Sequence, residues 1–261
     1  MMKDKVLLVT GSNEGIGFAI ARQSHQQGAK IVLHGLDDAA LEASAQKLGP
    51  DVKFISADLS SEDSPAKIVD FVLDSHGRID GLVNNAGMLD RNTLETASAA
   101  LSDKMFAVNF RAPMMLIQAA VTAMKKQGSS GSIVNIGSVN ASCGAPNLLI
   151  YSATKAALET MTKNLGATLA RDQIRINQVN VGWTATESEH RIQMGEGQPK
   201  NWQDIIPASY TPSGSLLSAE QVARHVVFWL SDGSAPITGQ VYEVEQFPII
   251  GRAFGSGWND E

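Results

Sequence analysis

The sequence contains a single cysteine, Cys143, among its 261 residues. One thiol excludes an internal disulfide framework and suits a reducing compartment. The chain has no run of Lys and Arg, and its net charge of -6 argues against a nucleic-acid backbone as a partner. It also lacks any stretch near the roughly 20 apolar residues of a membrane span, and the apolar run at 6–9 is too short for a signal peptide. We therefore expect a soluble, cytoplasmic protein.

Short apolar runs alternate with longer amphipathic segments along the chain. The pattern predicts strands at 5–10, 30–35, 53–57, 81–84, 132–136, 175–181 and 240–244, and helices at 15–27, 39–48, 66–75, 98–126, 151–171 and 219–230. Alternation at this spacing predicts an α/β protein with helices on both faces of a parallel sheet. Right-handed crossovers then give a doubly wound seven-stranded parallel sheet, the Rossmann fold, in three α/β/α layers.

The organisation is that of a single domain over 1–261, because no repeat, linker or composition shift marks a second one. The segment 187–217 is rich in Gly, Pro, Ser and Gln and has no clear hydrophobic period. Long irregular segments inside compact domains tend to be lids or binding loops. We expect a substrate lid around 187–217 and a C-terminal tail at 248–261.

A glycine-rich turn, Thr-Gly-Ser-Asn-Glu-Gly-Ile-Gly at 10–17, joins the first predicted strand to the first predicted helix. Glycines there permit a tight turn and let backbone N–H groups approach a pyrophosphate at a helix N-terminus. The spacing is looser than the usual dinucleotide fingerprint, and a purely structural turn is the alternative. Its position favours a dinucleotide site, with cofactor contacts predicted at Gly11, Asn13, Glu14, Gly15, Ile16 and Gly17.

Acidic residues favour NAD over NADP as the cofactor. A 2′-phosphate needs a nearby cation, whereas a free ribose 2′-hydroxyl suits a carboxylate. Glu14 in the glycine turn and Asp37 after the second strand occupy the expected positions. NADP stays open because His34 can carry a partial positive charge. Asp58, after the third strand, suits an adenine contact or equally a turn or helix cap.

Tyr151 and Lys155 lie four residues apart at the start of a predicted helix, so their side chains share one face. A free tyrosine has a pKa of about 10, and a nearby ammonium lowers that value and makes a usable acid–base group. Such a pair alone is common on solvated helices. Ser138, at the end of the preceding strand, reaches the same sheet edge. Asn109 has apolar neighbours, which suggest that it faces inward.

Five motifs occur in one order along nearly the whole chain: Thr-Gly-x-x-x-Gly-Ile-Gly at 10–17, Asn-Asn-Ala-Gly at 84–87, Asn109, Ser138 and Tyr-x-x-x-Lys at 151–155. In this combination the sequence resembles the compact short-chain dehydrogenase/reductase family. The resemblance implies that Tyr151 exchanges a proton with the substrate oxygen, while Lys155 binds the nicotinamide ribose and lowers the Tyr151 pKa. It also implies that Ser138 polarises the substrate oxygen and that Asn109 holds a water linking Lys155 to solvent.

The same resemblance implies further cofactor contacts. Asp58 would contact adenine, Asn85 and Gly87 would line the ribose, and Thr186 would touch the carboxamide side. The remaining predicted cofactor contacts are Leu59, Ala86, Tyr151, Lys155, Gly182 and Thr184. The chain departs from the family where Val181-Gly182 replaces Pro-Gly and where Glu245-Gln246-Phe247 replaces Asp-Gly-Gly. These departures weaken any transfer of substrate specificity from a relative.

The substrate pocket is expected to form from 140–149, Trp183 and the segment 187–217. Its predicted substrate contacts are Ser138, Asn140, Asn147, Trp183 and His190. Hydrogen-bonding groups of this kind suit a polyhydroxylated substrate, although a solvated loop has the same polarity. No His, Cys and Asp cluster has the spacing of metal ligands.

The sequence therefore predicts an NAD(P)-dependent alcohol dehydrogenase or ketoreductase that acts on CH–OH groups of a small molecule. An NADPH-dependent carbonyl reductase is one alternative. A non-catalytic dinucleotide-binding module is another, because a fold does not determine a function. Family members of this size are usually homotetramers and sometimes homodimers, which is the assembly that the resemblance implies.

Overall fold

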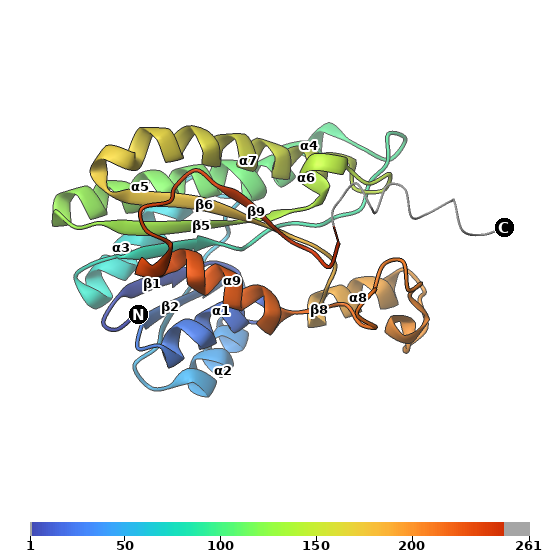
Figure 1. The fold of residues 1–261 in the computed structure, drawn as a ribbon, viewed down its shortest axis with the longest axis horizontal. Coiled ribbons are helices and arrows are strands. Elements are labelled where there is room, and N and C mark those ends of the chain that lie inside the picture. The colour runs from blue at the N-terminus through green and yellow to red at the C-terminus, as the bar shows by residue number, and fades with distance from the viewer. Residues whose placement is uncertain (1, 248–261) are drawn as a thin grey trace.

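The computed structural model describes residues 2–247. Within them, seven parallel strands form one sheet in the order β3-β2-β1-β4-β5-β6-β9, which confirms the predicted doubly wound sheet (Figure 1). The strands are β1 (Val6–Val9), β2 (Lys30–Gly35), β3 (Lys53–Ser56), β4 (Gly81–Asn84), β5 (Gly131–Ser138), β6 (Ile174–Val181) and β9 (Val241–Val244). The strand order reverses between β1 and β4. In such sheets ligands bind outside the carboxyl ends of the strands at this reversal.

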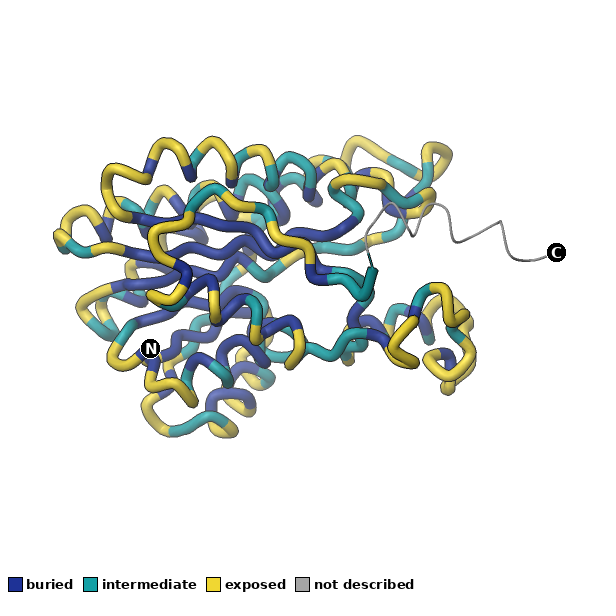
Figure 2. The backbone as a smooth tube through the Cα atoms, in the orientation of Figure 1, coloured by how far each residue is buried: buried dark blue, intermediate teal, exposed yellow. Residues whose placement is uncertain are grey.

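Helices cover both faces of the sheet. The helices α1 (Gly15–Gln26), α2 (Asp38–Leu48) and α9 (Ala219–Leu230) pack on one face, and α3 (Ser64–His76), α5 (Ala112–Gln127) and α7 (Leu149–Leu169) pack on the other. Figure 2 shows the strands buried between these two layers. Apolar side chains on both faces of each central strand explain why those strands appear as continuous apolar runs in the sequence.

The single helix predicted at 98–126 is divided into three parts. The helix α4 (Ala99–Phe106) leads into a π-helical turn (Ala107–Arg111), and α5 follows. Pro113 has no N–H with which to bond the carbonyl four residues earlier, so the regular α-helical pattern cannot continue through this point. Such π-helical turns occur frequently at functional sites. Asn109 lies in this turn.

The segment 187–217 is not irregular throughout, as the sequence pattern predicted. It begins with the helix α8 (Glu187–Gly195), contains a short 3₁₀ turn (Trp202–Ile205) and ends at β8 (Leu217–Ser218), which pairs with β7 (Thr184–Ala185). Thr186 caps α8 by accepting a hydrogen bond from the Glu189 N–H at 3.1 Å. The sequence of α8 carries only two large apolar residues, Ile192 and Met194. It therefore lacks the apolar stripe by which an amphipathic helix is recognised in a sequence.

Two other features bear on the predictions. The short helix α6 (Asn140–Cys143) was not predicted, because four residues are too few to show a period. The predicted tail at 248–261 lies outside the described residues. No helix within residues 2–247 has both the length and the apolar character needed to cross a membrane.

Candidate functional site

The glycine turn is shaped by backbone geometry that other residues do not readily adopt. Gly11 and Gly15 have φ values of +58° and +57°, in the left-handed region. A Cβ at Gly17 would lie 2.2 Å from the Gly11 carbonyl oxygen. Asn85 closes the turn from the other side, because its Nδ2 donates to the carbonyl oxygens of Thr10 and Gly11 at 2.9 and 2.8 Å. The turn therefore brings its backbone close to the carboxyl edge of β1 and β4.

The N-terminus of α1 fits an anionic group. Its N-cap residue, Glu14, makes no side-chain capping bond, so no side chain satisfies the backbone N–H groups of the first turn there. These groups and the helix dipole favour a phosphate. Glu14, predicted as a ribose contact, instead forms an ion pair with Arg191 of α8 through both carboxylate oxygens.

The residues predicted to choose between NAD and NADP are a buried histidine and an exposed carboxylate. The Nε2 of His34 donates to the Ala57 carbonyl oxygen at 3.1 Å, and its Nδ1 accepts from the Gly11 N–H. Burial lowers the His34 pKa to about 4, so the ring is neutral at pH 7. The partial charge that kept NADP open is therefore absent. Asp37 is exposed and caps α2 by accepting from the Ala40 N–H at 2.9 Å.

Of four other predicted cofactor contacts, three make hydrogen bonds within the protein and one is buried in its core. Asp58 is exposed and accepts from the Ser60 N–H at 2.8 Å. This bond agrees with the alternative prediction that Asp58 is a turn residue. Leu59 is buried in the core beneath α3. The Asn13 carbonyl oxygen accepts from the Ser44 hydroxyl, and the Ala86 N–H donates to the Thr10 hydroxyl at 3.0 Å.

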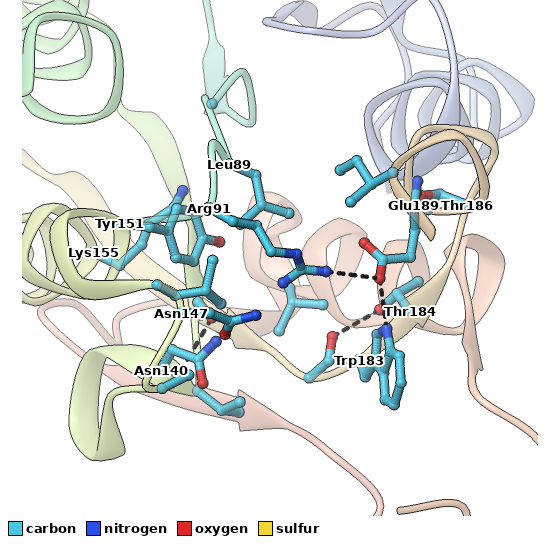
Figure 3. Close-up of a pocket in the computed structure, with 18 of the residues that line it drawn as sticks. Leu89, Arg91, Asn140, Asn147, Tyr151, Lys155, Trp183, Thr184, Thr186 and Glu189 are labelled. Atoms are coloured by element: carbon cyan, nitrogen blue, oxygen red, sulfur yellow. Dashed lines mark hydrogen bonds and ion pairs between the residues drawn. The ribbon is translucent and has the colours of Figure 1, made fainter. Parts of the chain in front are cut away.

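Three of the predicted catalytic residues, Ser138, Tyr151 and Lys155, line one cavity at the carboxyl end of β5. Figure 3 shows Tyr151 and Lys155 next to each other there. Tyr151 and Lys155 extend from the first turns of α7, and Ser138 ends β5. The Ser138 side chain is hydrogen-bonded to Tyr151. The Lys155 Nζ lies 5.6 Å from the centre of the Tyr151 ring and donates to the Ile136 carbonyl oxygen at 2.7 Å. The structure thus brings phenol, hydroxyl and ammonium to one place.

Asn109 is buried and joins three segments. Its Oδ1 accepts from the Met88 N–H at 2.7 Å, and its Nδ2 donates to the Met88 carbonyl oxygen and the Thr154 hydroxyl at 3.0 and 3.1 Å. A Cβ on Gly87 would lie 3.3 Å from the Asn109 Oδ1 and 3.6 Å from the Lys155 Nζ. Asn109 therefore fastens the loop after β4 to α7, and Gly87 lets that loop pass close to both side chains.

The expected lowering of the Tyr151 pKa by Lys155 is wrong for this arrangement. Burial raises the Tyr151 pKa to about 12, the hydrogen bond with Ser138 opposes that rise, and the negative charge of Glu189 adds to it. Burial also lowers the Lys155 pKa to about 8. Burial disfavours the charged form of each group. At pH 7 Tyr151 is a phenol and Lys155 is mainly an ammonium.

A cavity of about 890 Å³ opens over these residues. Among the predicted residues, those that line it are Ile16, Asn85, Gly87, Ser138, Asn140, Asn147, Tyr151, Lys155, Gly182, Trp183, Thr184 and Thr186. His190 does not line it. Its Nδ1 accepts from the Trp202 Nε1 at 3.0 Å, and the imidazole packs against the Trp202 ring.

Arg91 also lines the cavity and was not predicted from the sequence. It lies four residues beyond Gly87, in the loop that follows β4, and forms ion pairs with Glu189 and Glu196. Figure 3 shows the pair with Glu189. The position of Arg91 in the sequence, just after the carboxyl end of a central strand, is the one feature from which a role at the cavity could have been predicted. Its partners could not be found from the sequence, since both lie about 100 residues further on.

The two departures from the family pattern, at 181–182 and 245–247, meet in space. A Cβ on Gly182 would lie 2.1 Å from a carboxylate oxygen of Glu245, and the Trp183 N–H donates to the same carboxylate at 3.4 Å. Glu245 thus occupies the space beside a residue that has no side chain.

Comparisons with known proteins agree with this architecture. The protein-family model described as "Enoyl-(Acyl carrier protein) reductase" matches residues 11–246. The 2-(S)-hydroxypropyl-CoM dehydrogenase 3 of Xanthobacter autotrophicus is 32% identical over 247 residues, which are 94% of this chain and 96% of that protein. The short chain dehydrogenase adrF of Penicillium rubens is 32% identical over 256 residues, with 94% and 97% covered.

Solved structures show the same fold. The 3-ketoacyl-(acyl-carrier-protein) reductase of Brucella melitensis, complexed with NADH, has a TM-score of 0.83 at 29% identity and covers 94% of this chain and 98% of its own. A 3-oxoacyl-(acyl-carrier-protein) reductase of Agrobacterium tumefaciens with NADP bound has a TM-score of 0.84 at 24% identity, with 93% of each chain covered. The second likeness concerns the fold alone.

Proposed function

The chain belongs to the short-chain dehydrogenase/reductase family of NAD(P)-dependent oxidoreductases, and on that premise we propose that it moves a hydride between NAD(H) and an alcohol or carbonyl carbon. In this proposal Tyr151 is the general acid and base. The observation that carries it is the convergence of Tyr151, Ser138 and Lys155 on one cavity beside the glycine turn.

The side chains divide the chemistry among them. The Ser138 Oγ accepts from the Asn140 N–H at 3.2 Å and is also hydrogen-bonded to Tyr151. In this proposal a bound substrate oxygen accepts its hydrogen bond from the same hydroxyl. Tyr151, a phenol at neutral pH, donates its proton to a carbonyl oxygen in reduction and takes it back in oxidation. Lys155 supplies a positive charge beside the ring, and Asn109 holds α7 through its hydrogen bond to the Thr154 hydroxyl, next to Lys155. Bound NAD(H) supplies or accepts the hydride.

The cofactor site is built from the glycine turn, the start of α1 and the edge around Asn85 and Gly87. The uncapped first turn of α1 fits a pyrophosphate, and Lys155 lies 3.6 Å from the position a Gly87 Cβ would take. We assign NAD rather than NADP because Asp37 is an exposed carboxylate and His34 is neutral. We also assign the segment 187–217 as the lid of this cavity, because Glu189, Gln193 and Tyr210 line it.

Removing the phenolic oxygen of Tyr151 tests the catalytic role proposed for this residue. Tyr151→Phe should lower turnover by at least about 10²–10⁴, the usual contribution of general acid–base catalysis, and leave NADH affinity nearly unchanged. Tyr242→Phe, on the exposed strand β9, is the matched control and should keep full activity. Initial rates read by NADH absorbance and NADH titration by fluorescence measure the two effects. Retained turnover in Tyr151→Phe would remove Tyr151 from the mechanism.

The raised Tyr151 pKa favours a second candidate, a carbonyl reductase working mainly in the reductive direction, because a phenol is ready to donate. Initial rates with NADH and NADPH, in both directions, separate the two. A clear preference for NADPH contradicts the NAD assignment. If NAD binds but no alcohol or carbonyl in a broad panel turns over, the chain is a non-catalytic dinucleotide-binding module.

A further inference from the structure

An ion pair between a partly buried arginine, Arg91, and a buried carboxylate, Glu189, lines the cavity apart from the reacting groups. Figure 3 shows Arg91 between Tyr151 and Glu189, with its guanidinium turned toward the Glu189 carboxylate. The Nη2 of Arg91 lies 3.8 Å from the Glu189 Oε1, which is an ion-pair distance and too long for a hydrogen bond. Glu189 is only 8% exposed, so its carboxylate needs partners.

Each member of the pair keeps unused hydrogen-bonding capacity. The Glu189 Oε1 accepts from the Trp183 Nε1 at 2.9 Å and the Gln193 Nε2 at 2.8 Å. Within residues 2–247 its Oε2 accepts no hydrogen bond. Arg91 donates through Nε to Glu196, and neither of its Nη atoms donates a hydrogen bond to any residue in the same range. Among the described residues, the pair therefore offers one acceptor and several donors without a hydrogen-bond partner, side by side at the cavity.

The charges around the cavity cancel. Its charged lining residues are Arg91 and Lys155, which are positive, and Glu189 and Glu196, which are negative. An anion placed against Arg91 would meet two carboxylates, and a cation placed against Glu189 would meet Arg91. A neutral group that both donates and accepts hydrogen bonds fits this wall best, and a hydroxyl does both.

The neighbouring wall is aromatic. Trp183 lines the cavity and stacks on Trp202 at 5.8 Å between ring centres, while Tyr210 meets Trp183 edge-on at 6.2 Å. Aromatic faces are apolar surfaces, so the C–H side of a ring or chain can pack there while its hydroxyls reach the ion pair.

We infer that the substrate is a neutral polyhydroxylated molecule, and that a hydroxyl away from its reacting carbon donates to the Glu189 Oε2 and accepts from Arg91. This inference rests on the proposed function and adds a substrate class to it. Arg91 and Glu189 are then specificity residues: they distinguish a polyol from an alcohol of the same skeleton with a single hydroxyl.

Matched pairs of alcohols test it. We would compare kcat/KM for inositol with cyclohexanol and for glycerol with isopropanol, all with NAD. The wild-type chain should favour the polyhydroxylated member. In Glu189→Gln, which keeps the shape but makes a donor of the free acceptor, that preference should fall about 10- to 100-fold, the effect of losing a hydrogen bond to a charged group.

Controls separate specificity from folding. Glu187→Gln makes the same change on the exposed side of α8 and should leave the preference unchanged. Arg91→Lys keeps the charge but loses the planar fork, so it should reduce the preference in the same direction if Glu189→Gln fails to fold. Melting temperatures establish folding for each variant.

The outcomes distinguish this inference from the proposed function. A wild-type preference for the monohydroxy alcohols, or equal losses for both members of each pair in Glu189→Gln and Arg91→Lys, would overturn the inference alone. The same holds if charged alcohols, such as lactate, turn over better than polyols. If NAD binds and no alcohol or carbonyl turns over at all, the proposed function falls and the inference falls with it.

Discussion

The floor of the cavity and the helix α8 above it are held in place by different forces. The floor depends on buried hydrogen bonds: Asn109 to Met88 and Thr154, and Lys155 to Ile136. The helix is tied to the rest of the chain in part by ion pairs, and in the pair between Arg191 and Glu14 the side chains are 60% and 32% exposed. Buried bonds are insensitive to salt, and exposed pairs are screened by it. The difference assigns fixed catalytic geometry to the floor and adaptable contacts to α8.

The buried charge of Lys155 should produce the largest effect. Its pKa falls from 10.5 to about 8 in the folded chain, so the unfolded chain binds more protons between these pH values. The free energy of unfolding should therefore rise by up to about 3 kcal/mol as pH increases from 8 to 10.5. The raised pKa of Tyr151 works against this above its ordinary value of 10. Urea denaturation across this range measures the rise.

Substitution isolates the source of that pH dependence. Lys155→Met should lose the rise, whereas Lys163→Met, an exposed position on the same helix, should keep it. If the free energy of unfolding of the wild-type chain stays constant between pH 8 and 10, burial does not lower the Lys155 pKa. The strongest difference between the cavity floor and α8 would then be removed.

A glycine-to-alanine comparison gives the next largest effect. Gly17→Ala places a methyl group 2.2 Å from the Gly11 carbonyl oxygen, so the backbone must shift. Overpacking of this kind costs about 1–3 kcal/mol, and NAD affinity should fall with it. Gly195→Ala in α8 meets no atom within 4 Å and should leave NAD affinity unchanged. Isothermal titration with NAD checks both, and equal affinities in the two variants would contradict a tightly packed turn.

The smallest effect is expected at the exposed ion pair. Arg191→Gln should change the free energy of unfolding by about 1 kcal/mol or less, and the change should vanish near 1 M salt, where screening acts over about 3 Å. Arg22→Gln, which breaks the comparably exposed pair with Glu220, is the control. Thermal melts at low and high salt measure both. A large loss that persists at high salt would mean that packing holds α8.

Much of the site could be predicted because local sequence determines it. The strand ends that carry Ser138 and Asn85, and the helical spacing of Tyr151 and Lys155, follow from apolar periodicity and the usual connections of a parallel sheet. The π-helical turn at Asn109 was harder to predict from the sequence. It depends on Pro113 and on bonds to Met88, which is distant in sequence.

The sequence by itself determined the seven-stranded sheet, the glycine turn and the positions of the catalytic candidates, because strand and helix periods and glycine conformations are local properties. Only the tertiary structure decided the charge states of Tyr151, Lys155 and His34, because burial sets them. It also decided that Arg91 meets Glu189 and that His190 faces Trp202. Those contacts join residues from separate segments whose distance no sequence period encodes.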